Sequence, residues 1–284
     1  MSTTTPTSNS APSQPKPRPV YKLTARRVLR SEWAKLWSLR STWITLGVAL
    51  LVLVAFGLIA AATYSPSTGT TSMGGPPGSG TGSQDAISIA LTGGKFAQLA
   101  LGVLGVLITA GEYSTGMIRS TLTAVPKRLP VLWSKVMTFG VVALVVGTVG
   151  SISAFLSGTG FLHGETISLT LSSAGVLRSL LGAGVFFALV GVMGVALGAL
   201  FRSVAGGISV LVAGLLLLPA LTDLLPSSLK DDISSYLPGN AGSSIYALHQ
   251  ASDTLSPGAG LAVFAGWTVL TVVGAAYRLA RTDA

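Results

Sequence analysis

Residues 43–64 read WITLGVALLVLVAFGLIAAATY, a run of twenty-two residues that contains no charged side chain. A helix of this length crosses the roughly 30 Å hydrocarbon core of a bilayer, and the run is too long for the apolar region of a signal peptide. Five further apolar segments follow, at about residues 96–110 (continuing toward Glu112), 136–158, 177–201, 204–221 and 260–279. We therefore predict an all-α polytopic membrane protein with six transmembrane helices.

The composition of the whole chain agrees with this fold class. Of its 284 residues, 49% are hydrophobic and only 10% are charged, and the mean hydropathy is +0.68. Soluble domains carry about 25% charged residues. The composition therefore excludes a soluble globular protein.

The residue types that the chain lacks exclude several kinds of chemistry. Because there is no Cys, disulfides, zinc ribbons, iron–sulfur clusters and thiol catalysis are excluded, and two His are too few for a multi-His metal centre. The sequence has neither the P-loop pattern G-x-x-x-x-G-K-[ST] nor HExxH, and the middle of each predicted span has no ionisable residue. We predict a chain that is not an enzyme, holds no metal or cofactor, and depends on a partner for the energy of any transport cycle.

The distribution of charge predicts the orientation. If the N-terminus is cytoplasmic, fifteen of the eighteen basic residues fall in cytoplasmic segments, and the three outside are Lys95, Arg178 and Lys230. This is the positive-inside pattern of membrane proteins. We therefore predict a multi-pass protein of the cell membrane with both termini in the cytoplasm. The net charge of +9 then follows from the topology, and no nucleic-acid partner is expected.

Two segments precede the first span. Residues 1–22 are rich in Ser, Thr and Pro and predict a disordered cytoplasmic tail. Residues 23–42 predict an amphipathic interfacial helix that lies on the membrane, which makes the lipid bilayer a partner. Its apolar face, which Glu32 and Arg40 interrupt, carries Ala25, Leu29, Trp33, Leu36 and Trp37. The opposite face carries Arg27, Ser31, Lys35 and Ser38.

The six-span domain, residues 43–284, contains two loops of interest. The cytoplasmic loop 111–135 is basic, and its pattern predicts a short helix that ends at Pro126. Such a helix can receive force from a soluble partner, or it can be an ordinary connector at the membrane surface. The extracytoplasmic loop 223–259 predicts short helices on either side of a break at Pro238-Gly239.

The fourth span carries small residues at helical spacing. Small residues allow two helices to approach closely, so they indicate either packing within the chain or a seam with a second subunit. They are Gly184, Ala188, Gly191, Gly194 and Gly198.

The cytoplasmic loop resembles the first cytoplasmic loop of the ABC type-2 exporter permease family. The family pattern of a Glu, a Gly four residues later, a Leu-rich turn, a Pro, an Arg and a later Lys is matched by Glu112, Gly116, Leu122, Pro126, Arg128 and Lys135. The stretch SEWAKL at residues 31–36, with RSTW at 40–43, is similar to the helix that precedes the first span in the actinobacterial branch of that family. The outer stretch YLPGNAG at 236–242 and the ending RTDA at 281–284 are similar to that branch as well.

The resemblance implies the permease subunit of an ATP-binding-cassette exporter. Two such subunits, identical or sister permeases, would associate with two separate cytosolic ATPases, which hold the ATP and Mg. The coupling helix that meets the ATPase would depend on Glu112, Gly116, Arg119, Pro126, Lys127 and Arg128. The interfacial helix that braces it would depend on Glu32, Trp33, Lys35, Trp37 and Arg40.

Two other functions are compatible with the residues. A non-transporting membrane anchor or assembly factor for a cytosolic complex would use the same basic cytoplasmic face but would need no pathway. An ion-coupled carrier or intramembrane enzyme fits less well, because the spans are uncharged at their centres.

Overall fold

The computed structural model describes residues 24–64, 85–118, 129–162, 167, 169–222, 224, 226, 233–250 and 254–281. Every regular element in these ranges is helical, and six helices are long and apolar enough to cross a membrane, so the predicted fold class is confirmed. In chain order the elements are α1 (Ala25–Ser38), α2 (Arg40–Ala62), α3 (Ala86–Ala90), α4 (Gly94–Ser114), α6 (Leu129–Thr159), α7 (Val176–Phe201), α8 (Val204–Val212), the π-helical η1 (Ala213–Leu217), α9 (Leu218–Thr222), the 3-10 helix η2 (Ser234–Tyr236), α11 (Pro238–Ser244) and α12 (Pro257–Arg281).

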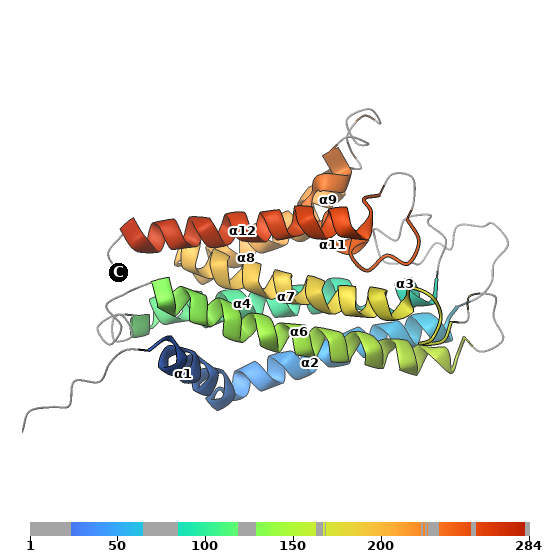
Figure 1. Ribbon diagram of the computed structural model, residues 1–284, viewed down its shortest axis with the longest axis horizontal. Coiled ribbons are helices and arrows are strands. Elements are labelled where there is room, and N and C mark those ends of the chain that lie inside the picture. Colours follow the sequence, from blue (N-terminus) through green and yellow to red (C-terminus); the bar gives the residue numbers. More distant parts are fainter. Residues whose placement is uncertain are drawn as a thin grey trace, which may run out of the picture.

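The long helices form one bundle with two distinct ends (Figure 1). Helix α1 and the C-terminal end of α12 lie at one end, called here the α1 end, and α3 and α11 lie at the other, the α3 end. The ends of α4 and α7 and the start of α6 also reach the α1 end. The loop between α4 and α6 therefore leaves and re-enters the bundle at the end where α1 lies.

Helix α7 is the centre of the bundle. In its most apolar stretch 67% of the residues are buried, against 17% in the span Val204–Thr222 and 28% in α2 and in α12. It packs against α4, α6, α8 and α12. The three less enclosed spans therefore present apolar faces outward, as helices in contact with lipid do.

The contact between α4 and α7 is made by backbone. A Cβ atom placed on Gly105 would lie 2.5 Å from the carbonyl oxygen of Gly191, and one placed on Gly198 would lie 2.8 Å from that of Val106. Gly194 meets the Gly102 carbonyl in the same way. The small residues of the fourth span thus serve packing within the chain, which was one of the two predicted roles.

Two predicted boundaries are wrong at the α1 end. The interfacial helix ends at Ser38, and the first span begins at Arg40, because Leu39 has an extended backbone (φ −86°, ψ 110°) that separates the two helices. The third span begins at Leu129 and not near residue 136, so Lys135 lies in the second turn of α6 and not in the loop. The reason is that the charge of Lys135 is neutralised inside the bundle, as described below.

The predicted short helices around Pro238-Gly239 are present at the α3 end. The break lies at Leu237, whose backbone is extended between η2 and α11, and Pro238 and Gly239 form the first two positions of α11, where a fixed φ and a missing N–H suit Pro. Helix α11 packs against α12 and against Phe186 of α7, and Trp267 of α12 donates a hydrogen bond to the Tyr236 carbonyl. The predicted tail 1–22 and part of the 223–259 loop lie outside the described residues.

The close approach of α4 and α7 leads to a prediction. Gly105→Ala should lower the free energy of unfolding by about 1–3 kcal/mol, because its new methyl group meets backbone that has no rotamer to change. Gly47→Ala in α2 and Gly266→Ala in α12 are matched controls, since a Cβ at either position has no neighbour within 4 Å. Melting temperatures in detergent measure the difference, and an equal effect at Gly105 and Gly47 would contradict the packing argument.

Candidate functional site

Four charged side chains meet at the α1 end. The Nζ atom of Lys135 lies 2.7 Å from Oε2 of Glu32 and 2.7 Å from Oε1 of Glu112. The Nζ atom of Lys35 lies 2.8 Å from Oε1 of Glu32 and 3.1 Å from Oε1 of Glu112. Each ammonium group thus contacts both carboxylates. We call these four residues the charge cluster.

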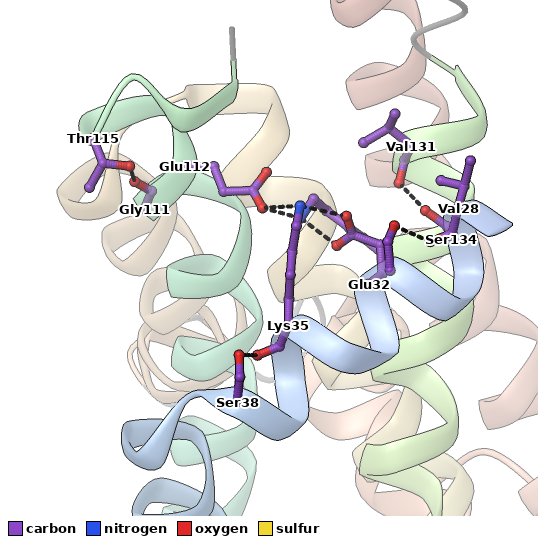
Figure 2. A network of polar contacts seen from close by, with 11 residues as sticks. Val28, Glu32, Lys35, Ser38, Gly111, Glu112, Thr115, Val131 and Ser134 are labelled. Carbon is purple, nitrogen blue, oxygen red and sulfur yellow. Dashed lines mark hydrogen bonds and ion pairs between the residues drawn. The ribbon is translucent and has the colours of Figure 1, made fainter. Parts of the chain in front are cut away.

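Three helices contribute to the charge cluster (Figure 2). Glu32 and Lys35 are three residues apart on α1 and point toward Glu112, which lies in the last turn of α4. Lys135 comes from the second turn of α6. Because α4 ends at Ser114 and α6 begins at Leu129, the cluster joins α1 to both ends of the connecting loop.

The charge cluster is enclosed. Lys135, Glu32 and Glu112 expose only 3%, 5% and 8% of their side chains, whereas Lys35 exposes 31%. A buried charge that loses its partner typically costs 3–5 kcal/mol. The cluster therefore holds α1 in place, since removing either carboxylate or the Lys135 ammonium leaves an unmatched buried charge.

The pKa of Lys35 is raised above its ordinary value of 10.5. Burial lowers this pKa, but the hydrogen bond and Coulomb attraction from Glu32, together with the smaller effect of Glu112, outweigh it. Lys35 therefore remains charged at neutral pH.

One oxygen of the cluster has no partner in the described part of the chain. Oε2 of Glu112 is buried and accepts no hydrogen bond there, and the same holds for Oγ1 of Thr109, one turn earlier on α4. Glu112 thus makes all its described polar contacts through Oε1. The second oxygen is a free acceptor at the point where α4 leads into the loop.

A second set of contacts at the α1 end involves Tyr113, the residue that follows Glu112 on α4. The guanidinium of Arg202 lies over the ring of Tyr113, 5.2 Å from its centre, and Arg278 of α12 donates a hydrogen bond to the Leu200 carbonyl. Arg202 has a positive φ of 55° and forms the tight turn between α7 and α8. The last turn of α4 therefore contacts α1 and α6 through Glu112, and the α7–α8 turn through Tyr113.

The predicted interfacial residues divide into two groups. Glu32 and Lys35 belong to the charge cluster, whereas Trp33, Trp37 and Arg40 are exposed. The predicted apolar face is wrong in one respect. Glu32 is part of the face of α1 that packs against the bundle, and it does not interrupt that face. The residues of α1 that the bundle buries are Val28, Glu32 and Leu36.

Most of the predicted coupling residues lie outside the described residues. Glu112 lies in the charge cluster, and Gly116 is exposed with a φ of +71°, a conformation that favours Gly. For Arg119, Pro126, Lys127 and Arg128, and for the short helix that Pro126 is predicted to end, the roles stay predictions. Within the described ranges no three His, Asp or Glu residues lie close enough together to hold a metal ion.

Comparison with known proteins does not assign the chain to a family. No protein-family model matches it, and no curated protein matches it.

The balance of charge in the cluster leads to a prediction. Lys135→Met should lower the free energy of unfolding by about 3–5 kcal/mol, because two buried carboxylates then share the Lys35 ammonium alone. The double variant Lys135→Met with Glu112→Gln should recover part of this loss, because Glu32 and Lys35 remain as a balanced pair. Melting temperatures of the single and double variants measure the coupling, and Arg40→Gln, which removes an exposed positive charge, is the control. Additive losses in the double variant would show that the residues do not act together.

The raised pKa of Lys35 leads to a second prediction. A group whose pKa is higher in the folded chain stabilises it fully below the unfolded pKa and loses this effect only as the pH rises through the folded value. The difference in melting temperature between the wild type and Lys35→Met should therefore be constant between about pH 7 and pH 9, and should shrink only above about pH 10.5. A difference that already decreases below pH 9 would contradict this assignment.

Proposed function

We propose that this chain is the membrane-spanning permease subunit of an ATP-binding-cassette transporter, acting as an exporter in the cell membrane with both termini in the cytoplasm. A separate cytosolic ATPase would bind and hydrolyse ATP, because the chain has no P-loop sequence of its own. A second permease subunit, identical or related, would complete the pathway. The α1 end would then be the cytoplasmic end, in agreement with the positive-inside pattern.

The observation that carries this proposal is the position of the charge cluster. It joins α1 to the last turn of α4 and the second turn of α6, which are the two helices that the loop connects. A push on this loop by a soluble partner would therefore move α1, α4 and α6 together. An ordinary surface connector does not need its flanking helices and a neighbouring helix to be joined by buried ion pairs.

The mechanism follows from the two sets of contacts on α4. Through Glu112 the displacement would reach α1 and α6, and through Tyr113 it would reach the turn between α7 and α8. ATP-driven closure of the ATPases would in this way shift the spans as rigid bodies between inward-open and outward-open states. The uncharged centres of the spans agree with a cycle whose energy comes from outside the chain.

A purification from the native membrane tests the proposal. The tagged chain, extracted in a mild detergent, should bring with it a stoichiometric soluble protein that carries a P-loop, identified by mass spectrometry. Arg128→Glu should weaken this association severalfold, because it reverses a charge in the loop that would meet the ATPase. Lys230→Glu is the matched control, since it reverses the same charge in the loop predicted to lie on the opposite side.

The outcomes separate the proposed functions. Purification of the chain without a P-loop protein, in a preparation that keeps other complexes intact, would refute the permease proposal. A P-loop partner whose ATP hydrolysis produces no change in cross-links between spans would favour the anchor or assembly factor. Loss of association in both Arg128→Glu and Lys230→Glu would remove the assignment of the coupling surface to the 111–135 loop.

A further inference from the structure

The surface of α1 divides into a buried face and an exposed face at 100° per residue. The first, with Val28, Glu32 and Leu36, is buried against the bundle and belongs to the contacts already described. The exposed face carries two kinds of side chain, aromatic and basic.

The aromatic side chains of the exposed face form a continuous row along α1. Leu29, Trp33 and Trp37 are 39%, 40% and 52% exposed, and the rings of the two tryptophans meet edge-on with centres 5.5 Å apart. Trp37 also stacks on Trp43 in the first turn of α2, with ring centres 4.0 Å apart, so the row continues across the bend at Leu39. Tryptophan rings prefer the headgroup level of a bilayer. The row therefore places α1 at the surface of the membrane that α2 crosses.

Two basic side chains share this exposed face with the aromatic row. Arg26 and Arg30 are one turn apart and exposed, and on the helix they lie next to Trp33 and Trp37. Glu32 is the only acidic residue among the first 84 residues of the chain, and it is held in the charge cluster. The guanidinium groups of this face thus have no carboxylate on α1 to neutralise them.

We propose that Arg26 and Arg30 bind the phosphate group of an anionic phospholipid, next to the exposed row of tryptophans. A guanidinium matches phosphate oxygens in a bidentate geometry, and the tryptophans hold it at the depth of the headgroups. Because α1 also supplies Glu32 and Lys35, the bound lipid stabilises the charge cluster. This inference does not depend on the proposed transport function, since it requires only that the six helices lie in a bilayer.

The test measures lipid binding directly. The full chain in detergent is titrated with phosphatidylglycerol or with phosphatidylcholine of the same acyl chains, and bound lipid is counted by native mass spectrometry. The wild type should prefer phosphatidylglycerol, and the double variant R26Q/R30Q should bind it about tenfold more weakly, with phosphatidylcholine binding unchanged. The variant K16Q/R18Q removes the same charge from outside α1 and should keep the wild-type preference.

Three results would overturn the inference. The first is equal phosphatidylglycerol binding by R26Q/R30Q and the wild type. The second is a loss of phosphatidylglycerol binding in K16Q/R18Q as large as that in R26Q/R30Q. The third is displacement of the bound phosphatidylglycerol by inorganic phosphate at the same concentration. Both arginines are exposed, so the helical content and the melting temperature in phosphatidylcholine should not change. If the double variant does not fold, Arg26→Gln and Arg30→Gln alone should each weaken phosphatidylglycerol binding by roughly threefold, and no loss in either would reject the site.

Discussion

The ammonium group of Lys135, held between the carboxylates of Glu32 and Glu112, is the contact on which the α1 end of the bundle depends. A lysine buried at the edge of an apolar bundle is stable only where opposite charges surround it closely. Satisfying it brings together residues from α1, α4 and α6, two of them 103 positions apart in the chain. This contact fixes α1 against the last turn of α4 and the second turn of α6.

The bundle is held together differently at its centre and at this end. In the centre, α7 packs through fully buried apolar side chains and through glycines that meet backbone, and little there is polar. At the α1 end, Glu112 and Tyr113 are adjacent on α4 and face different neighbours. Polar contacts are directional and depend on distance, whereas apolar packing is not directional. The α1 end, where ion pairs join three helices, is thus expected to respond strongly to a change of charge or of partner.

The sequence was enough to predict the six spanning helices, because apolar runs of sufficient length are a local property. It was not enough to predict where two of them begin. A charge usually marks the end of a span, so the pattern predicts Lys135 in the loop. A helical wheel includes only the residues of one helix, so it shows Glu32 as an interruption of the apolar face. One feature of the sequence does point to the charge cluster. Acidic residues are rare in the basic segments predicted to be cytoplasmic, and Glu32 and Glu112 are two of these few acidic residues. Which lysine each acid meets depends on the tertiary structure and cannot be obtained from spacing.

The backbone contact between α4 and α7 has a mechanical consequence. Where helices touch through side chains, rotamers can adjust as one helix slides along the other, but the Gly102 and Val106 carbonyls meet Gly194 and Gly198 with no side chain between them. The two helices therefore form one rigid unit that runs the length of the bundle. A change of shape is then expected at the contacts of this unit with α2, α12 and the Val204–Thr222 span, which are the least enclosed helices. A small movement of the last turn of α4 would therefore reach the centre of the bundle through this pair of helices.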